Sequence, residues 1–135
     1  DSTLALNLRA PWLCAREAAG CMGQQGGVII NITDVGAQKS WTGYPAYTVS
    51  KAALETLTRL LARQLAPAVR VNAVAPGLIL PSAALSPEEW QRLVNRLPMQ
   101  RAGSPEDVAQ AVVSLIQNEY ITGETLRVDG GYALI

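Results

Sequence analysis

Two short runs of apolar residues, 28–32 and 69–74, constrain the fold of this chain more than any other feature. The first run is rich in β-branched residues, follows a glycine-rich segment and ends shortly before Asp34, and the second run ends just before Pro76-Gly77. A continuous apolar run between turn residues is typical of a parallel strand that is buried on both faces. We therefore predict that residues 28–32 form a central strand and that residues 69–74 form the next strand.

Four helical patterns alternate with these runs. Apolar residues recur every three or four positions over residues 4–22 and 45–65, as they do on the buried face of a helix. In residues 86–89 and 104–107 a serine, a proline and two acidic residues follow one another, which is the signature of a capped helix start. A last strand is predicted at residues 125–128.

This order of elements predicts an α/β fold. Helix, strand, helix, strand, two helices and a strand are typical of an open parallel sheet with right-handed crossovers. No internal repeat or low-complexity segment interrupts the order. In such sheets ligands bind at the carboxyl ends of the strands, which is where Asp34 and Pro76-Gly77 fall. The functional site is therefore expected at that edge.

The composition favours a soluble globular domain and excludes several classes of partner. Hydrophobic residues make up 49% of the 135 residues and charged residues 16%, and 11 basic residues balance 11 acidic ones. Such a chain can bury a core but presents no broad basic surface, so we expect neither a nucleic acid nor a membrane as partner. No apolar stretch approaches the roughly 20 residues of a membrane span, and no signal peptide is recognisable, which favours a cytoplasmic location.

The cysteine content and the start of the chain lead to two further expectations. Cys14 and Cys21 would be separated by about 10 Å of helix, too far for a disulfide, so both are predicted to be free thiols. Because histidine is absent, a zinc or iron site would have to use carboxylates alone, and we predict no metal site. The chain begins at Asp1 inside a helical pattern and has no glycine-rich turn for a pyrophosphate, so we expect it to be incomplete.

Tyr47 and Lys51 are the first candidate catalytic residues. They lie four positions apart in the 45–65 helical pattern, so their side chains share one face of the predicted helix. An ammonium group about 4 Å from a phenol, at an effective dielectric constant of about 20, favours the phenolate by about 4 kcal/mol. We therefore predict that Lys51 lowers the pKa of Tyr47 toward neutrality, which suits proton donation. The pair alone is also compatible with two surface residues.

The residues around this pair resemble those of the short-chain dehydrogenase/reductase family over essentially the whole chain. The matching segments are the strand at 28–33, Tyr47 with Ser50-Lys51-Ala52-Ala53, residues 71–77, and residues 121–123 leading to Asp129-Gly130-Gly131. The resemblance implies a Rossmann-like, doubly wound parallel sheet. It also implies that residues 1–135 are the C-terminal part of a single domain whose N-terminal dinucleotide-binding part is absent from this chain.

The same resemblance assigns roles to further residues. Asn7 matches the family's catalytic asparagine, which anchors a water molecule beside the lysine, and Lys51 would contact the nicotinamide ribose. The residues expected to bind the cofactor are Ile32, Thr33, Tyr47, Lys51, Pro76, Gly77, Leu78 and Ile79. Family members are commonly tetramers, and the broad apolar surface of the 45–65 helix, with that of the first helix, favours a homotetramer.

Asp34 departs from the family's pattern. A serine that donates a hydrogen bond to the substrate oxygen normally lies 13 residues before the tyrosine, where this chain has Asp34. A carboxylate would add like charge next to the alkoxide that forms from a ketone. We therefore predict a substrate that offers an N–H group or accepts a proton at nitrogen. The alternative is a turn residue that caps the end of the strand before Gly36.

Asp34 and its surroundings are similar to those of the pteridine reductases, which use NADPH to reduce pterins and folates. The similarity includes Tyr44, the Pro76-Gly77-Leu78 loop, and residues 120–123 and 128–132. It implies that Tyr47 protonates a ring nitrogen of the substrate while Asp34 orients the ring. The catalytic residues would be Asp34, Tyr47, Lys51 and Asn7, and the substrate-binding residues Asp34, Trp41, Tyr44, Tyr47 and Leu78.

Several apolar residues have two possible roles. Trp41 would form an aromatic wall for a flat heterocycle, although packing on the core explains this residue equally well. Residues 80–99 correspond to the family's segment that closes over the substrate. Leu85, Trp90 and Met99 in this segment either contact the substrate or pack within the protein.

Two other functions remain as alternatives. The first is a carbonyl or alcohol oxidoreductase of the same family, similar to 3-ketoacyl reductases, that tolerates Asp34. The second is an inactive fragment, because the part that binds the dinucleotide is absent. The preference for NADPH over NADH and the choice between a pterin and a folate rest on the resemblance alone.

Overall fold

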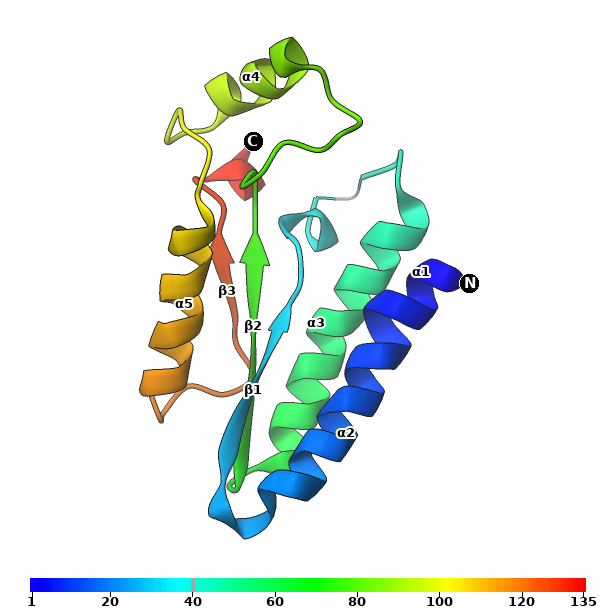
Figure 1. The fold of residues 1–135 in the computed structure, drawn as a ribbon, viewed down its shortest axis with the longest axis vertical. Helices are drawn as coiled ribbons and strands as arrows, with labels where there is room; N and C mark the ends of the chain where they lie inside the picture. Colours follow the sequence, from blue (N-terminus) through cyan, green and yellow to red (C-terminus); the bar gives the residue numbers. More distant parts are fainter. Residues whose placement is uncertain (40) are drawn as a thin grey trace.

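The computed structural model describes residues 1–39 and 41–135, apart from the side chain of Gln24, and shows a parallel sheet with helices on both faces (Figure 1). Helices α2 (Ala10–Met22) and α3 (Pro45–Leu65) cover one face, and α5 (Pro105–Gln117) covers the other. Helix α4 (Pro87–Arg96) lies beyond the carboxyl ends of the strands, close to the C-terminus. The predicted α/β fold is confirmed.

The sheet is made by β1 (Gly27–Ile32), β2 (Val69–Pro76) and β3 (Thr125–Val128), in the order β1-β2-β3 within the described residues. Both pairs of strands are parallel: Gly27 lies opposite Val69, and Ala73 lies opposite Thr125. Parallel pairing places the carboxyl ends of neighbouring strands at the same edge. The segments that follow β1 and β2 therefore meet at one end of the sheet.

The central strand of the sheet is β2. Val71 and Val74 of β2 are fully buried, whereas Ile32 at the end of β1 is 46% exposed. Among the described residues β1 is the edge strand of the sheet, so the prediction that residues 28–32 form a central strand stays a prediction. In this part of the chain β1 pairs with β2 alone, and most of its side chains are partly buried.

The core lies on both faces of β2. Ala62 of α3 packs with Val71 on one face, and Leu115 of α5 packs with Val74 on the other. Burying a valine or leucine side chain stabilises the fold by roughly 1.5–3 kcal/mol. The two helices thus hold β2 from both sides and fix the position of its carboxyl end.

Both predicted capped helix starts are confirmed. Ser86 Oγ accepts a hydrogen bond from the Glu89 N–H at 3.2 Å, and the Glu89 carboxylate accepts one from the Ser86 N–H at 2.8 Å. Ser104 and Asp107 form the same reciprocal pair at the start of α5. These capping boxes satisfy N–H groups that have no partner inside the helix, and they fix where each helix begins.

The first predicted helix is interrupted around Asn7. A short helix α1 (Ser2–Leu4) leads into the π-helical turn η1 (Ala5–Arg9), and α2 follows directly. Such π-helical turns are often found at functional sites. Cys14 and Cys21 are both exposed free thiols, as predicted.

Candidate active site

Tyr47 and Asp34 meet at the carboxyl end of β1. Tyr47 lies in the first turn of α3, which Pro45 opens, and its Oη donates a hydrogen bond to Asp34 Oδ2 at 2.8 Å. The other carboxylate oxygen, Oδ1, accepts the Gly36 N–H at 2.6 Å and so caps the 3₁₀ turn η3 (Val35–Ala37). Asp34 therefore caps the turn, as one of the two interpretations of its sequence position expected, and its other oxygen contacts Tyr47.

The pKa of Tyr47 is raised, not lowered. Burial is the largest cause, and the hydrogen bond to Asp34 and the charge of Asp34 add to it. The Lys51 ammonium lies 5.8 Å from the centre of the Tyr47 ring and donates its hydrogen bond to the Ile32 carbonyl oxygen at 3.0 Å. The predicted lowering is wrong because a carboxylate in direct contact outweighs a more distant ammonium. Tyr47 consequently keeps its proton in this arrangement.

Lys51 is half-buried one turn further along α3. Burial lowers the pKa of Lys51, and the charge of Asp34 opposes that effect. Its contact with the carbonyl of Ile32 places the ammonium group at the end of β1, on the same helix face as Tyr47. Tyr47 and Lys51 thus lie on one face of α3, as predicted, and Asp34 contacts Tyr47.

Asn7 reaches the site through Ser50. Its Nδ2 donates to Ser50 Oγ at 3.1 Å, and Ser50 Oγ donates to the Tyr47 carbonyl oxygen at 2.7 Å. Ser50 is fully buried, and sequence reasoning did not assign it a role. The sequence signal that could have identified Ser50 is its position as a small polar residue between the tyrosine and the lysine. In the structure Asn7 thus joins η1 to the first turn of α3.

Glu55 is a buried carboxyl on α3, two turns beyond Tyr47. It is 8% exposed, and Gln38 Nε2 donates to its Oε1 at 3.4 Å. Burial is the largest influence on Glu55 and raises its pKa, while Gln38, Arg59 and other groups oppose the shift. A carboxyl whose folded pKa is raised adds stability below its unfolded pKa, and this stability is lost as pH rises through the folded value.

The variant Glu55→Gln is therefore expected to reduce the loss of stability on going from about pH 5 to about pH 7. The measurement is denaturant unfolding of the full-length protein at both pH values. Glu119→Gln, at an exposed position, is the control and should leave the difference between the two pH values unchanged. An equal pH dependence in wild type and Glu55→Gln would contradict the expectation.

A cavity of about 770 Å³ opens onto Asp34 and Tyr47. Trp41, Tyr44 and Leu78, which the sequence predicted to bind substrate, all line it. The loop after β1, the start of α3 and the end of β2 thus converge on one space. The size of this cavity is in the range of sites for small ligands.

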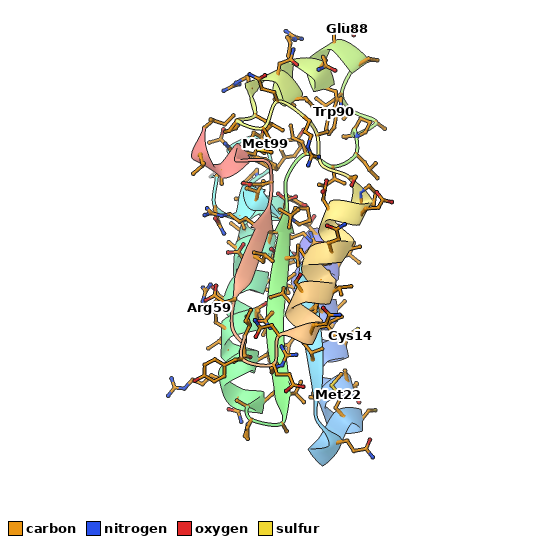
Figure 2. The ribbon with its side chains drawn as sticks, turned by 90° about the vertical axis from the view of Figure 1, so that its left-hand side faces the viewer. Cys14, Met22, Arg59, Glu88, Trp90 and Met99 are labelled. Carbon is orange, nitrogen blue, oxygen red and sulfur yellow. The ribbon has the colours of Figure 1, made fainter. Side chains whose placement is uncertain are left out.

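The segment at 80–99 supplies the far wall of the cavity. Leu85 and Trp90 line it, whereas Met99 does not and is 61% exposed. Figure 2 shows Trp90 and Met99 in the layer between α4 and the carboxyl ends of the strands. Tyr132, in the 3₁₀ turn η4 (Tyr132–Leu134), also lines the cavity, although sequence reasoning gave it no role.

The predicted cofactor residues lie together at the carboxyl ends of β1 and β2. Thr33 Oγ1 donates to the Val74 carbonyl oxygen at 3.2 Å, and the Gly77 N–H donates to the Val128 carbonyl oxygen at 3.0 Å. A Cβ on Gly77 would lie 2.7 Å from the Cα of Asp129, so only glycine fits this close approach. The following residues, Leu78 and Ile79, continue this loop beyond β2.

Neither a membrane-spanning helix nor a cluster of metal-binding side chains is present in the described ranges, 1–39 and 41–135. In that part of the chain, no helix combines the length and the apolar character needed to cross a membrane. Across the same ranges, no group of three or more histidine, cysteine, aspartate or glutamate side chains is arranged to hold a metal ion.

Fold and site together define a Rossmann-like α/β protein with a tyrosine–lysine site at the carboxyl edge of its sheet. The family model described as "Enoyl-(Acyl carrier protein) reductase" matches residues 1–133. Carbonyl reductase family member 4 of Danio rerio is 42% identical over 135 residues, which cover 99% of this chain and 56% of that protein. The 3-oxoacyl-[acyl-carrier-protein] reductase FabG of Rickettsia bellii is 38% identical over 141 residues, which cover 100% and 58%.

A solved structure is similar to this chain in both fold and sequence. FolM alternative dihydrofolate reductase 1 from Brucella suis, in complex with NADP, is 37% identical and matches with a TM-score of 0.95. The match covers 100% of this chain and 55% of that one. The chain belongs to the short-chain dehydrogenase/reductase family. It spans about half the length of the relatives it matches.

Proposed function

We propose that the full-length protein containing these residues is an NADPH-dependent oxidoreductase that reduces a C=N bond of a pterin or folate. The observation that carries the proposal is the 2.8 Å hydrogen bond from Tyr47 Oη to Asp34 Oδ2, which puts a carboxylate beside the proton donor. The similarity to a structure described as an alternative dihydrofolate reductase with NADP supports it. In this proposal residues 1–135 are the C-terminal part of one Rossmann-like domain.

The residues at the strand ends fit one side of a nicotinamide cofactor. Ile32 is 46% exposed and offers apolar surface at the end of β1, and the Lys51 ammonium lies within hydrogen-bond distance of the Ile32 carbonyl. Gly77 lets the backbone after β2 pack against Asp129, and this contact fixes the start of the loop that continues to Leu78. We therefore assign Ile32, Thr33, Tyr47, Lys51, Pro76, Gly77, Leu78 and Ile79 to the cofactor side of the site.

The chemistry of this site follows from its charges. When bound, the nicotinamide supplies a hydride to the ring carbon of the C=N bond. Tyr47 then donates its Oη proton to the ring nitrogen, and the Lys51 ammonium stabilises the phenolate that forms. Asp34 accepts a hydrogen bond from a ring N–H and so orients the substrate. The bond from Asn7 to Ser50 positions the helix turn that carries Tyr47.

The test is nicotinamide absorbance with the full-length protein, NADPH, and dihydrobiopterin or dihydrofolate. Turnover of at least one of the two is expected. In the variant Asp34→Ser, we expect kcat/KM for that substrate to fall about tenfold, because the acceptor for the ring N–H is lost. NADPH binding serves as the control and should be unchanged. Activity on a 3-oxoacyl substrate without turnover of either heterocycle would overturn the proposal.

A carbonyl or 3-oxoacyl reductase is the second candidate. Two relatives carry such names, carbonyl reductase family member 4 and 3-oxoacyl-[acyl-carrier-protein] reductase FabG. The Asp34 carboxylate disfavours this candidate because it faces the position of a developing alkoxide. Improved reduction of a ketone by Asp34→Ser, together with loss of pterin reduction, is the result expected from the first proposal. A full-length protein that does not bind NADPH would support the inactive alternative instead.

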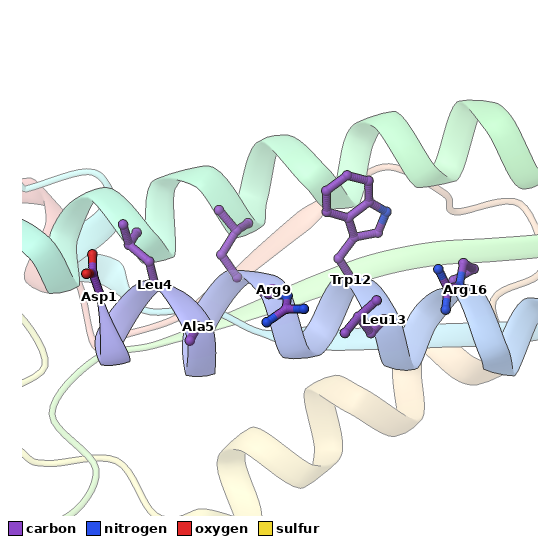
Figure 3. A pocket seen from close by; sticks show the side chains of 8 residues that line it. Asp1, Leu4, Ala5, Arg9, Trp12, Leu13 and Arg16 are labelled. Atoms are coloured by element: carbon purple, nitrogen blue, oxygen red, sulfur yellow. The ribbon is translucent and has the colours of Figure 1, made fainter.

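We also propose that the full-length protein is a homotetramer whose subunits contact one another through η1, α2 and α3. Leu6, Trp12 and Leu60 are all more than half exposed on the adjoining segments η1, α2 and α3. A hollow of about 540 Å³ is lined by residues between Asp1 and Arg16, in the N-terminal helical segment. Figure 3 shows Leu4 and Trp12 on the side of this segment that faces α3. Large apolar surface of this kind is typical of subunit interfaces.

Light scattering of the full-length protein tests the assembly. For the wild type, a mass of four chains is expected. The variant Leu60→Glu is expected to give smaller species, because it places a charge in the apolar surface. A monomeric wild type would contradict this part of the proposal. The cytoplasmic location stays a prediction from the sequence.

A further inference from the structure

Lys39 joins two segments that are far apart in the sequence. Its Nζ donates to the Tyr132 carbonyl oxygen at 2.8 Å and also to the carbonyl oxygen of Ile135. The same ammonium group lies 4.3 Å from the centre of the Tyr132 ring, within the range of a cation–π interaction. One side chain from the loop after β1 therefore contacts the backbone and the ring of the C-terminal turn η4.

The Tyr132 ring is part of the site cavity. It packs against Trp41 with the ring centres 6.2 Å apart and the planes tilted by 50°. Trp41 in turn lies over Gly36, where a Cβ would come within 2.7 Å of the indole ring. Both rings line the cavity that contains Asp34 and Tyr47. The aromatic wall thus spans the loop after β1 and the C-terminal turn.

The base of η4 is held independently of Lys39. Asp129 Oδ1 accepts the Gly131 N–H at 3.0 Å, and Asp129 Oδ2 accepts the Ala133 N–H at 2.8 Å. Gly131 has a positive φ of 85°, and a Cβ there would lie 2.6 Å from Pro98 Cγ. These contacts fix where the turn begins but do not fasten the Tyr132 ring.

The far end of the turn is poorly buried. Leu134 is 76% exposed and Ile135 is 46% exposed, so apolar packing contributes little to holding this end. The contacts of Lys39 with Tyr132 and Ile135 are the polar ties between this end and the loop after β1 among the described residues. Lys39 and Trp41 are therefore the residues of the loop after β1 that contact the Tyr132 ring or its backbone.

We propose that Lys39 is a positioning residue that sets substrate specificity by holding the Tyr132 ring beside Trp41 in the wall of the site cavity. This inference rests on the proposed reduction of a flat heterocycle. Tyr132 and Trp41 present ring surface to the substrate, while Asp34 and Tyr47 contact its nitrogens. Lys39 itself acts through Tyr132 and does not take part in proton transfer.

The test compares Lys39→Met and Lys39→Arg in the full-length enzyme, with NADPH and dihydrobiopterin. We expect Lys39→Met to raise KM for dihydrobiopterin about tenfold with little change in kcat, because the ring contact is weakened while the proton donor is untouched. Lys39→Arg keeps a cation over the ring, so its KM for dihydrobiopterin should stay close to the wild-type value. KM for NADPH should be unchanged in both variants.

Tyr132→Ala is a second variant that does not depend on how well the lysine substitution is tolerated. It should raise KM for dihydrobiopterin as Lys39→Met does, and the double variant should be no worse than either alone. Tyr120→Ala, at a tyrosine that is 99% exposed, is the matched control and should leave KM unchanged. An unchanged KM in Tyr132→Ala, or additive effects in the double variant, would overturn the inference.

Amide hydrogen exchange separates this inference from the proposed function. Lys39→Met should speed exchange at the Leu134 N–H, which bonds the Gly131 carbonyl at 2.9 Å, in the absence of any substrate. Unchanged exchange in Lys39→Met contradicts the role of Lys39. A wild type that reduces neither dihydrobiopterin nor dihydrofolate contradicts the proposed function, whatever the exchange result.

Discussion

Tyr47→Phe is expected to lower kcat of the full-length enzyme by about a thousandfold, because it removes the only proton that Tyr47 donates and leaves the ring in place. The phenylalanine ring keeps the packing of the first turn of α3, so the fold and NADPH binding should be retained. Steady-state kinetics with dihydrobiopterin, alongside NADPH titration, measures both effects. The same argument predicts that the wild-type donor stays protonated beyond about pH 10, where a free tyrosine ionises, because burial and Asp34 raise the pKa of Tyr47.

Tyr44→Phe is the matched control for this prediction. Tyr44 lines the same cavity three residues earlier and is 64% exposed, but the hydrogen bond to Asp34 comes from Tyr47. Its loss of hydroxyl should therefore change kcat far less than that of Tyr47. Comparable losses in the two variants would show that Tyr47 is not the proton donor.

Arg70→Met is expected to lower the free energy of unfolding by about 3 kcal/mol. The Arg70 guanidinium donates to the carbonyl oxygens of Leu115 at 2.9 Å, Ile116 at 2.8 Å and Ile121 at 3.0 Å. These bonds satisfy carbonyls in the last turn of α5 and in the loop that leads to β3. The positive charge also complements the negative end of the helix dipole.

Denaturant unfolding of the full-length protein measures this loss. Arg127→Met is the control, because Arg127 is exposed and its hydrogen bond to Gln38 is long, at 3.3 Å. Its effect should be below about 1 kcal/mol. An Arg70 variant no less stable than the Arg127 variant would show that the three carbonyl contacts contribute little.

Local sequence signals predicted the elements and their order well. The serine caps at Ser86 and Ser104 place the starts of α4 and α5 correctly because a capping box involves only residues three positions apart. The expectation that Asp34 and Tyr47 share one site came from the family resemblance, and in the structure the two side chains are hydrogen-bonded.

Features that depend on distant parts of the chain were not predictable in the same way. The direction of the Tyr47 pKa shift depends on a 2.8 Å contact with Asp34, and helical spacing gives no information about it. Tyr132 lies 93 residues after Lys39, and their contact follows from the path of the C-terminal turn. The order of the strands depends on which strands pair, which hydrophobicity alone does not encode.

The outer side of β1 carries backbone N–H and C=O groups without a strand partner among the described residues. An apolar strand edge of this kind is a template for adding another strand, including one from a second molecule. In a newly synthesised or truncated chain, this edge is a site for sheet-to-sheet aggregation.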